Sequence, residues 1–222
     1  MKLEKIKTIS GEIDLLTGLH IGASKDSIEI GGMDQPIVKH PITGEPYVPG
    51  SSIKGKMRSL IELAYFPEKV KDGNPCSCGK KDCPVCTIFG ASGDKKDEDL
   101  GPTRLVVRDA YLTETWKKKF ESGDLPMEEK YENTIDRIKG TAANPRPLER
   151  VPAGVSFDFN LSFKVFEGDD PSLLEYVFKG LRLIELDALG GQSSRGSGQV
   201  RFTHIKEDGE EKPDDFLTTF NL

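Results

Sequence analysis

The chain has 222 residues, of which 36% are hydrophobic and 31% are charged. This composition is too apolar for an intrinsically disordered protein and too charged for a membrane-spanning one. The first residues contain no apolar segment with a cleavage site, so we expect no signal peptide, no membrane association and a cytoplasmic location. Thiols stay reduced there, which makes the four cysteines better candidates for metal ligands than for disulfides.

The net charge of −6 argues against nucleic-acid binding until its distribution is considered. Residues 206–215 carry six acids and two lysines, and residues 92–99 carry four acids and two lysines. The charges of these two stretches, −4 and −2, account for the whole net charge of −6. Residues 51–60 and 191–201 contain basic side chains and no acid. The acidic total is therefore compatible with a local basic surface.

The first half of the chain predicts one strand, a hairpin and a helix. Apolar and polar residues alternate over 9–15, which is typical of a half-buried strand. Residues 36–50 read as a hairpin with a Thr-Gly turn. Ser51 or Ser52 is expected to cap a helix over 52–66, whose apolar stripe faces the core.

The second half predicts two further strands, a helix and a last strand, separated by insertions. The predicted elements are a strand over 103–112, a short helix and then an irregular polar stretch within 113–153, a strand over 155–165, a helix from Pro171 that ends at Gly190–Gly191, and a strand over 199–205. The acidic residues that follow are expected to form a solvated, mobile end.

Without its insertions, the predicted order is strand, helix, strand, strand, helix, strand. This order is typical of the α+β ferredoxin-like fold, and the RNA-recognition module shares it. Many unrelated proteins use the same plan, so the fold class alone does not establish a function.

The cysteines form one cluster with the spacing of a zinc knuckle. The pattern C-x-C-x4-C-x2-C places Cys76, Cys78, Cys83 and Cys86 within 11 residues. Four thiolates can close a tetrahedral shell around Zn²⁺ and leave no position for substrate, so the predicted site is structural. It would order an insertion that has few apolar residues of its own.

Two further segments are candidates for binding an anion. Lys54 and Arg58 lie one helical turn apart, near a helix N-terminus that itself favours negative charge. Together with Ser51 and Ser52, which precede them, they are candidate RNA-binding residues. The loop before the last strand is rich in glycine, which lets backbone N–H groups approach a phosphate. Its candidate RNA-binding residues are Gly190, Gly191, Ser193, Ser194, Arg195, Gly196 and Gly198.

Four segments together resemble the RAMP superfamily of CRISPR proteins. They are 18–22, 41–59, 131–150 and 190–202. Within that superfamily the chain is most similar to the repeated backbone subunits, third in the Csm series, of type III-A effector complexes. The resemblance implies one domain over 1–222. Its parts are a core of 1–16, 51–65, 103–112 and 154–205, a lid over 66–102, a thumb over 113–153 and the acidic tail 206–222.

The resemblance implies a backbone subunit that also cleaves RNA. Copies would stack head to tail on a guide crRNA, beside other Csm subunits, and cut bound single-stranded target RNA at regular intervals. Asp34 matches the family's catalytic position, where it would support Mg²⁺ or Mn²⁺ and yield a 2′,3′-cyclic phosphate and a 5′-OH. The matching guide-RNA contacts are His20, Lys54 and Arg58, and those of the thumb are Arg137, Arg146 and Arg150.

Several alternatives stay open from the sequence. Asp34 lies in a glycine-rich loop, where Asp is usually a turn former; Glu29 is the nearest carboxylate that could replace it. Glu132 and Asp136 are a second carboxylate pair, if the segment between them is a helix. At the level of function, the alternatives are a purely architectural RNA-binding subunit and a RAMP endoribonuclease that processes guide precursors.

Overall fold

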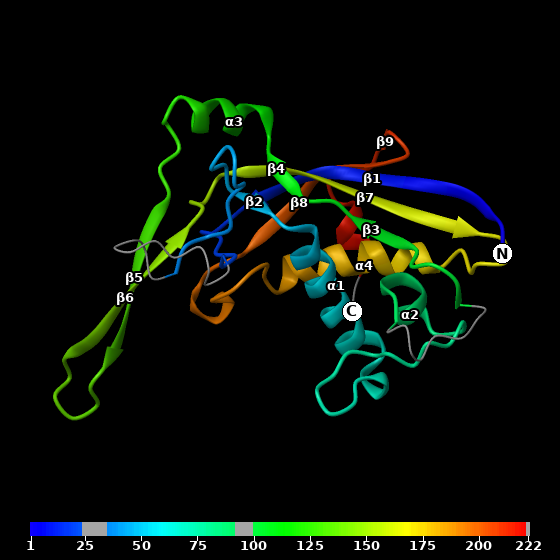
Figure 1. Cartoon of the computed structure of the whole chain (residues 1–222), viewed down its shortest axis with the longest axis horizontal. Helices are drawn as coiled ribbons and strands as arrows, with labels where there is room; N and C mark the ends of the chain where they lie inside the picture. The colour runs from blue at the N-terminus through cyan, green and yellow to red at the C-terminus, as the bar shows by residue number, and fades with distance from the viewer. Residues whose placement is uncertain (24–34, 92–99, 221–222) are drawn as a thin grey trace.

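The centre of the molecule is an antiparallel sheet with two helices, α1 and α4, against one face (Figure 1). The computed structural model describes residues 1–23, 35–91 and 100–220. The strands lie in the order β2–β4–β7–β1–β8–β9, and β3 pairs with β7 as β4 does. The elements of this layer are β1 (Leu3–Leu15), β2 (Tyr47–Val48), α1 (Gly50–Tyr65), β3 (Leu105–Val107), β4 (Ala110–Leu112), β7 (Ser156–Phe166), α4 (Leu173–Leu186), β8 (Val200–Glu207) and β9 (Glu210–Glu211).

The connectivity confirms the predicted α+β ferredoxin-like class. If β3 and β4 are counted as one interrupted strand, the core runs β1, α1, β3/β4, β7, α4, β8. The first strand lies between the third and the fourth, and the second strand lies outside the third. That arrangement is the split βαβ plan that the pattern of alternating and helical segments predicts.

The core lies between the sheet and the two helices. Ile9 and Ile13 of β1 pair with Leu161 and Phe157 of β7, and all four side chains are buried. Met57 of α1 is fully buried against the same layer. Burial of each such side chain contributes roughly 1.5–3 kcal/mol. The strict alternation along β7 is therefore the strongest single signal for the fold.

The start of α1 differs from the prediction. The helix begins at Gly50, so Pro49 and not Ser51 or Ser52 is in the cap position. The Pro49 side chain cannot accept a hydrogen bond from the first helical N–H groups. The carboxylate of Asp109 accepts a 2.7 Å hydrogen bond from the Gly50 N–H instead. Asp109 can reach it because the predicted strand over 103–112 is interrupted between β3 and β4. The cap is thus a tertiary contact.

A long hairpin stands where the sequence predicts an irregular polar stretch. After α3 (Glu114–Glu121), β5 (Glu128–Ile135) and β6 (Ala142–Arg150) form a separate two-stranded sheet that projects from the body as an arm (Figure 1). Opposite charges face each other across it, as in Glu128–Arg150 and Glu132–Arg146. Because both faces are largely exposed, its residues show no apolar alternation, and the sequence pattern misses it.

The C-terminal segment is also more ordered than predicted. α4 ends at Leu186, so Gly190–Gly191 belong to the loop that follows rather than to the helix end. After β9, the short helix η6 (Phe216–Thr219) returns to α4, where Phe216 and Phe220 pack around Phe178 at ring distances of 4.9 and 5.9 Å. These aromatic contacts hold the acidic segment against the core up to residue 220.

A buried ion pair joins the loop before β3 to the turn that follows β7. The guanidinium of Arg104, 1% exposed, donates two hydrogen bonds to Asp169 at 2.9 and 2.7 Å. Burial alone would raise the pKa of Asp169, but the bonds from Arg104 and from the Phe166 N–H hold that pKa below its usual value. The carbonyl groups of Leu100 and Pro102 accept two further hydrogen bonds, both from Nη1 of Arg104 and both 2.7 Å long.

We predict that Asp169→Asn lowers the free energy of unfolding by about 3 kcal/mol, because it leaves Arg104 buried without a counter-charge. The melting temperature should fall by roughly 6–12 °C. The depressed pKa of Asp169 contributes stability above about pH 4, and the wild type loses it as the pH falls further. The variant should lack that loss. Glu114→Gln, in the exposed pair with Lys118, is the control and should change stability by less than about 1 kcal/mol; an equal effect would contradict the prediction.

Candidate nucleic-acid interface and metal centre

The glycine-rich loop between α4 and β8 packs closely on the segment after β1. Gly190 and Gly198 have positive φ angles of 79° and 81°. A Cβ on Gly190 would lie 2.5 Å from the carbonyl oxygen of His20, and one on Gly198 would lie 2.0 Å from that of Leu189. The Gly191 N–H donates to the His20 carbonyl at 2.8 Å. Gly190 and Gly198 therefore serve close backbone packing, whereas Gly191 contributes only its N–H group.

The middle of the same loop faces outward. Ser193, Ser194 and Arg195 form the short helix η5 and are exposed. Gly196 follows in open space, with no atom near the position of a Cβ. The candidate residues of this loop thus divide into Gly190 and Gly198, which shape it, and the exposed Gly191 and residues 193–196, which a ligand could reach.

His20 lies beneath this loop and is only 7% exposed. Its Nδ1 donates a 2.8 Å hydrogen bond to the carbonyl of Glu149 in β6. Glu149 in turn accepts hydrogen bonds from the Ile37 N–H at 3.0 Å and from Lys39 at 2.5 Å. Glu149 was not a predicted site residue, and no sequence motif marks it. It ties the chain after residue 34 to the base of the hairpin.

The hairpin and Arg195 of the glycine-rich loop line an open hollow of about 510 Å³. Four of its lining residues are cations, Lys130, Arg137, Arg146 and Arg195, and one is the carboxylate Glu132. Arg150 is absent from the lining. It is held at the hairpin base by Glu128 and by Ser197, whose hydroxyl lies 3.0 Å away. The structure thus gathers Arg137, Arg146 and Arg195, and it adds Lys130, which the sequence analysis did not identify.

Glu132 and Asp136 do not form a carboxylate pair. Glu132 lies on β5 and contacts Arg195. Asp136 lies in the turn of the hairpin, where its side chain accepts 2.9 Å hydrogen bonds from the N–H groups of Ile138 and Lys139. Those bonds lower the pKa of Asp136. The pair depended on a helix between the two residues, and that condition is not met because the segment is a strand and a turn.

The start of α1 is less open than predicted. Ser51 is exposed and Ser52 half-buried, but the Lys54 ammonium donates a 3.1 Å hydrogen bond to the Leu105 carbonyl. Burial lowers the pKa of Lys54, and the neighbouring cations Arg58 and Lys164 lower it further. Arg58 is bonded to the protein as well. The two side chains share a side of the helix, as expected, but not a free basic surface.

The four cysteine sulfurs converge as the spacing predicts. They lie within 4.8 Å of one another, and the Cys76 sulfur is 3.8, 3.7 and 3.8 Å from those of Cys78, Cys83 and Cys86. A tetrahedral shell with metal–sulfur bonds of about 2.3 Å requires sulfur separations of about 3.8 Å. The cluster can therefore hold a metal ion. Burial favours the neutral thiols of Cys83 and Cys86 and so raises their pKa. A bound cation would have the opposite effect, because it favours the thiolates.

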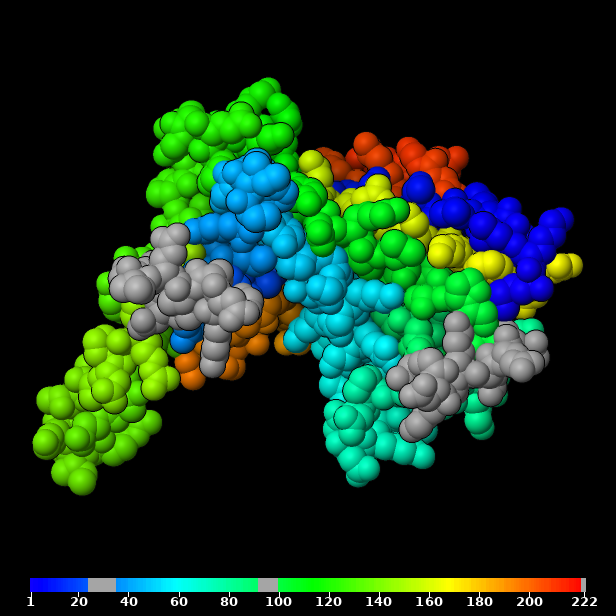
Figure 2. Space-filling model, in the orientation of Figure 1, coloured from blue at the N-terminus to red at the C-terminus, as the bar shows by residue number. Residues whose placement is uncertain are grey.

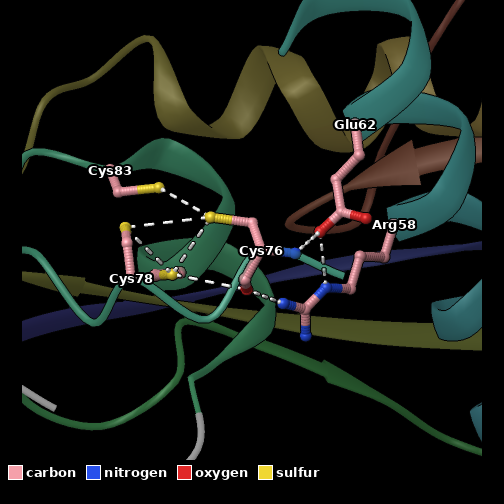
Figure 3. Close-up of polar contacts among 6 residues, drawn as sticks. Arg58, Glu62, Cys76, Cys78 and Cys83 are labelled. Atoms are coloured by element: carbon pink, nitrogen blue, oxygen red, sulfur yellow. Dashed lines mark hydrogen bonds and ion pairs between the residues drawn. The ribbon is translucent and has the colours of Figure 1, made fainter. Parts of the chain in front are cut away.

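Arg58 and Glu62 of α1 clamp the first cysteine of this cluster (Figure 3). The Glu62 carboxylate, buried at 4% exposure, accepts 3.0 Å hydrogen bonds from the Cys76 N–H and from Arg58 Nε. Arg58 also donates to the Cys76 carbonyl. The cysteine segment and α2 (Pro84–Phe89), whose Cys86 is a ligand candidate, are thereby fixed to the helix.

The predicted catalytic residue Asp34 and its neighbour Glu29 lie outside the described residues.

The turn predicted within 36–50 is present: the Gly44 N–H donates to the His40 carbonyl, and Lys39 and Pro46 form a β-bridge. In the described part of the chain, no helix is long and apolar enough to cross a membrane.

Comparison with known proteins identifies the family. A family model of the RAMP superfamily matches residues 12–201. A Methanothermobacter thermautotrophicus protein named CRISPR system Cms endoribonuclease Csm3 is 47% identical over 93% of this chain and 87% of its own length. A Streptococcus thermophilus protein of the same name is 41% identical, over 93% and 90%.

Solved structures agree in fold. The crystal structure of a Csm3–Csm4 subcomplex in the type III-A CRISPR-Cas interference complex covers 93% of this chain and 80% of its own, with a TM-score of 0.61 and 31% identity. The Methanopyrus kandleri Csm3 structure covers 89% and 75%, also with a TM-score of 0.61, at 28% identity. The chain belongs to the RAMP superfamily and, within it, to the Csm3 family.

Proposed function

We propose that this chain is a guide-RNA-binding backbone subunit of a type III-A CRISPR interference complex and that it cleaves the bound target RNA. The observation that carries this proposal is the 41–47% identity, along almost the whole chain, to relatives named endoribonucleases. The cationic hollow between the hairpin and the glycine-rich loop supports it, since phosphate contacts from Lys and Arg supply most of the affinity for RNA.

In this proposal the segments take the family's roles. Residues 66–102 are the lid and 113–153 are the thumb, whose β5–β6 hairpin reaches away from the body (Figure 2). Copies of the chain stack head to tail along the guide crRNA, beside other Csm subunits. A regular stack of copies with one cutting site each would cleave target RNA at regular intervals.

The proposed chemistry needs no protein nucleophile. The 2′-oxygen of the target ribose attacks the adjacent phosphorus while the bond from phosphorus to the 5′-oxygen breaks. The 2′-hydroxyl loses its proton and the leaving 5′-oxygen gains one, which yields a 2′,3′-cyclic phosphate and a 5′-OH. Asp34 would hold a divalent cation, Mg²⁺ or Mn²⁺, that neutralises charge on the phosphate.

For the cysteine cluster we propose a structural Zn²⁺. Four sulfur ligands at tetrahedral separations favour zinc over the oxygen-preferring Mg²⁺. The clamp by Arg58 and Glu62 would make metal binding stabilise the junction between the lid and α1.

Two alternatives remain distinguishable by experiment. A purely architectural subunit would bind complementary RNA in the assembled complex without cutting it. A guide-processing enzyme would cut precursor guides rather than targets, and enzymes of that kind typically carry two tandem modules, whereas one is described here. Incubation of the assembled complex with complementary RNA and Mg²⁺ separates these functions.

We expect Asp34→Ala to slow target cleavage by about 100-fold or more while target affinity stays nearly unchanged, because the carboxylate acts on the transition state. The assay is a time course on complementary RNA, scored for cyclic-phosphate ends. Glu29→Gln, in the same loop, is the matched variant and should keep cutting. Wild-type rates in the Asp34 variant would reduce this residue to a turn former.

For the metal, we expect about one Zn²⁺ per chain in native mass spectrometry. Cys83→Ser should abolish it and lower the melting temperature by about 10 °C. Any cleavage by the fraction that remains folded should persist, because the metal centre is structural. Chelator treatment of the wild type should reproduce the loss, and zinc should restore it. If the wild-type chain is folded with zinc available, binds none and is as stable as expected for the zinc-bound form, the assignment is wrong.

Lys54 matches a guide-binding position of the family, where its ammonium would exchange the hydrogen bond to the Leu105 carbonyl for one to an RNA phosphate. Lys54→Ala should then weaken RNA binding to a similar extent for unrelated sequences and flatten the salt dependence by roughly one contact. Lys56→Ala is the control on the same helix, because the Lys56 ammonium is paired with Asp187 at 2.6 Å. Affinities measured at several salt concentrations decide the matter. A loss confined to one RNA sequence would indicate base recognition instead.

A further inference from the structure

One ion-pair network joins the middle of β5 to the glycine-rich loop, and Glu132 is its centre. Glu132 Oε2 accepts a hydrogen bond from Arg195 Nη1, and Lys130 Nζ lies 3.7 Å from Glu132 Oε1. Lys130 also donates a 2.9 Å hydrogen bond to the carbonyl of Arg195. One carboxylate therefore lies between two cations that come from separate segments of the chain.

The surroundings of Glu132 favour an anion that is larger than a carboxylate. The Arg195 side chain is 61% exposed and opens onto the hollow, where Arg137 and Arg146 add two further positive charges. Among the described residues that line this hollow, Glu132 is the single acid. A phosphodiester of an RNA strand in the hollow would meet the same two cations, Arg195 and Lys130.

Glu132 itself is incompletely satisfied in this position. Its side chain is 17% exposed, and its Oε1 is shielded from solvent without a hydrogen-bond partner among the described residues. A shielded carboxylate oxygen without a hydrogen bond costs free energy. The contact is therefore one that a competing anion can displace.

We propose that Glu132 is an internal stand-in for an RNA phosphate. In the RNA-free chain it neutralises Arg195 and Lys130, and a phosphodiester of the bound RNA takes its place and turns the carboxylate out. The inference rests on the proposed RNA-binding function and adds to it a site, a ligand class and a built-in competitor. Glu132 then lowers RNA affinity, because binding must exchange one anion for another.

A purely structural tie makes the opposite prediction. If Glu132 only fastens the hairpin to the loop, removal of its charge loosens the hairpin and weakens RNA binding. If it competes with RNA, the same removal tightens binding. The sign of the change in affinity therefore separates the two roles.

The experiment compares Glu132→Gln with Glu129→Gln in the full-length chain. Glu129 lies on the same strand, is exposed, and accepts a 2.6 Å hydrogen bond from the Tyr131 hydroxyl, so its variant removes an equal charge away from Arg195. The probe is a fluorescent single-stranded RNA, titrated at several salt concentrations. We expect roughly three- to tenfold tighter binding for Glu132→Gln and less than about twofold for Glu129→Gln.

The salt dependence gives a second readout. In the wild type the displaced carboxylate takes up a counter-ion, which offsets one released by the RNA. Glu132→Gln should therefore steepen the slope of log affinity against log salt by about 0.7. In an Arg195→Gln background, the gain in affinity from Glu132→Gln should shrink by at least about half, because its partner is gone.

Unchanged or weaker binding by a folded Glu132→Gln variant, relative to Glu129→Gln, would overturn the inference and leave the proposed function standing. A wild-type chain that binds no RNA, alone or in the complex, would overturn the proposed function itself. If thermal melting shows that Glu132→Gln is poorly folded, Glu132→Thr repeats the test with a residue that favours strands.

Discussion

The antiparallel pairing of β1 with β7 is the contact on which the other parts of the molecule depend. It runs from Leu3–Phe166 to Asp14–Ser156 and sets which face of each strand is buried. A shift by one residue would turn the apolar side chains of β7 to solvent and leave α1 and α4 without a core to cover. The pairing also brings the end of β1 next to the start of β7. The proposed RNA-binding segments connect to these strand ends, since β1 leads to the His20 segment and β7 follows the hairpin.

From this frame, the proposed RNA-binding surface is assembled by loops that the core brings side by side. The glycine-rich loop leaves α4 and packs on His20, while Lys130 and Arg150 tie the hairpin to Arg195 and Ser197. The tie between Lys130 and Arg195 is exposed, whereas His20 and Ser197 are buried. The exposed tie can be exchanged for a contact with an RNA backbone at small cost, which suits a surface that is proposed to close on a charged ligand.

Some residues at or near the proposed sites have structural roles. Arg58 was expected at the RNA surface, yet it holds the Cys76 carbonyl and the buried carboxylate of Glu62. A lid docked in this way would make metal binding and the position of α1 interdependent. Glu149 likewise holds two neighbours, since its carbonyl accepts a hydrogen bond from His20 and its carboxylate accepts one from Lys39. Substitution of any of these residues will therefore affect stability as well as binding, and the two need separate measurement.

By itself the sequence determined the features that depend on local periodicity or spacing: the strand β7, the two amphipathic helices, the ferredoxin-like order and the convergence of the four cysteines. These follow from burial on one face or from ligands close together in the chain. Only the tertiary structure decided which polar side chains that are far apart in sequence form hydrogen bonds and ion pairs. The β5–β6 hairpin has no buried face to leave a pattern, and the partner of Glu132 lies 63 residues away at Arg195. Because an ion pair needs only proximity in space, no local signal could have revealed it.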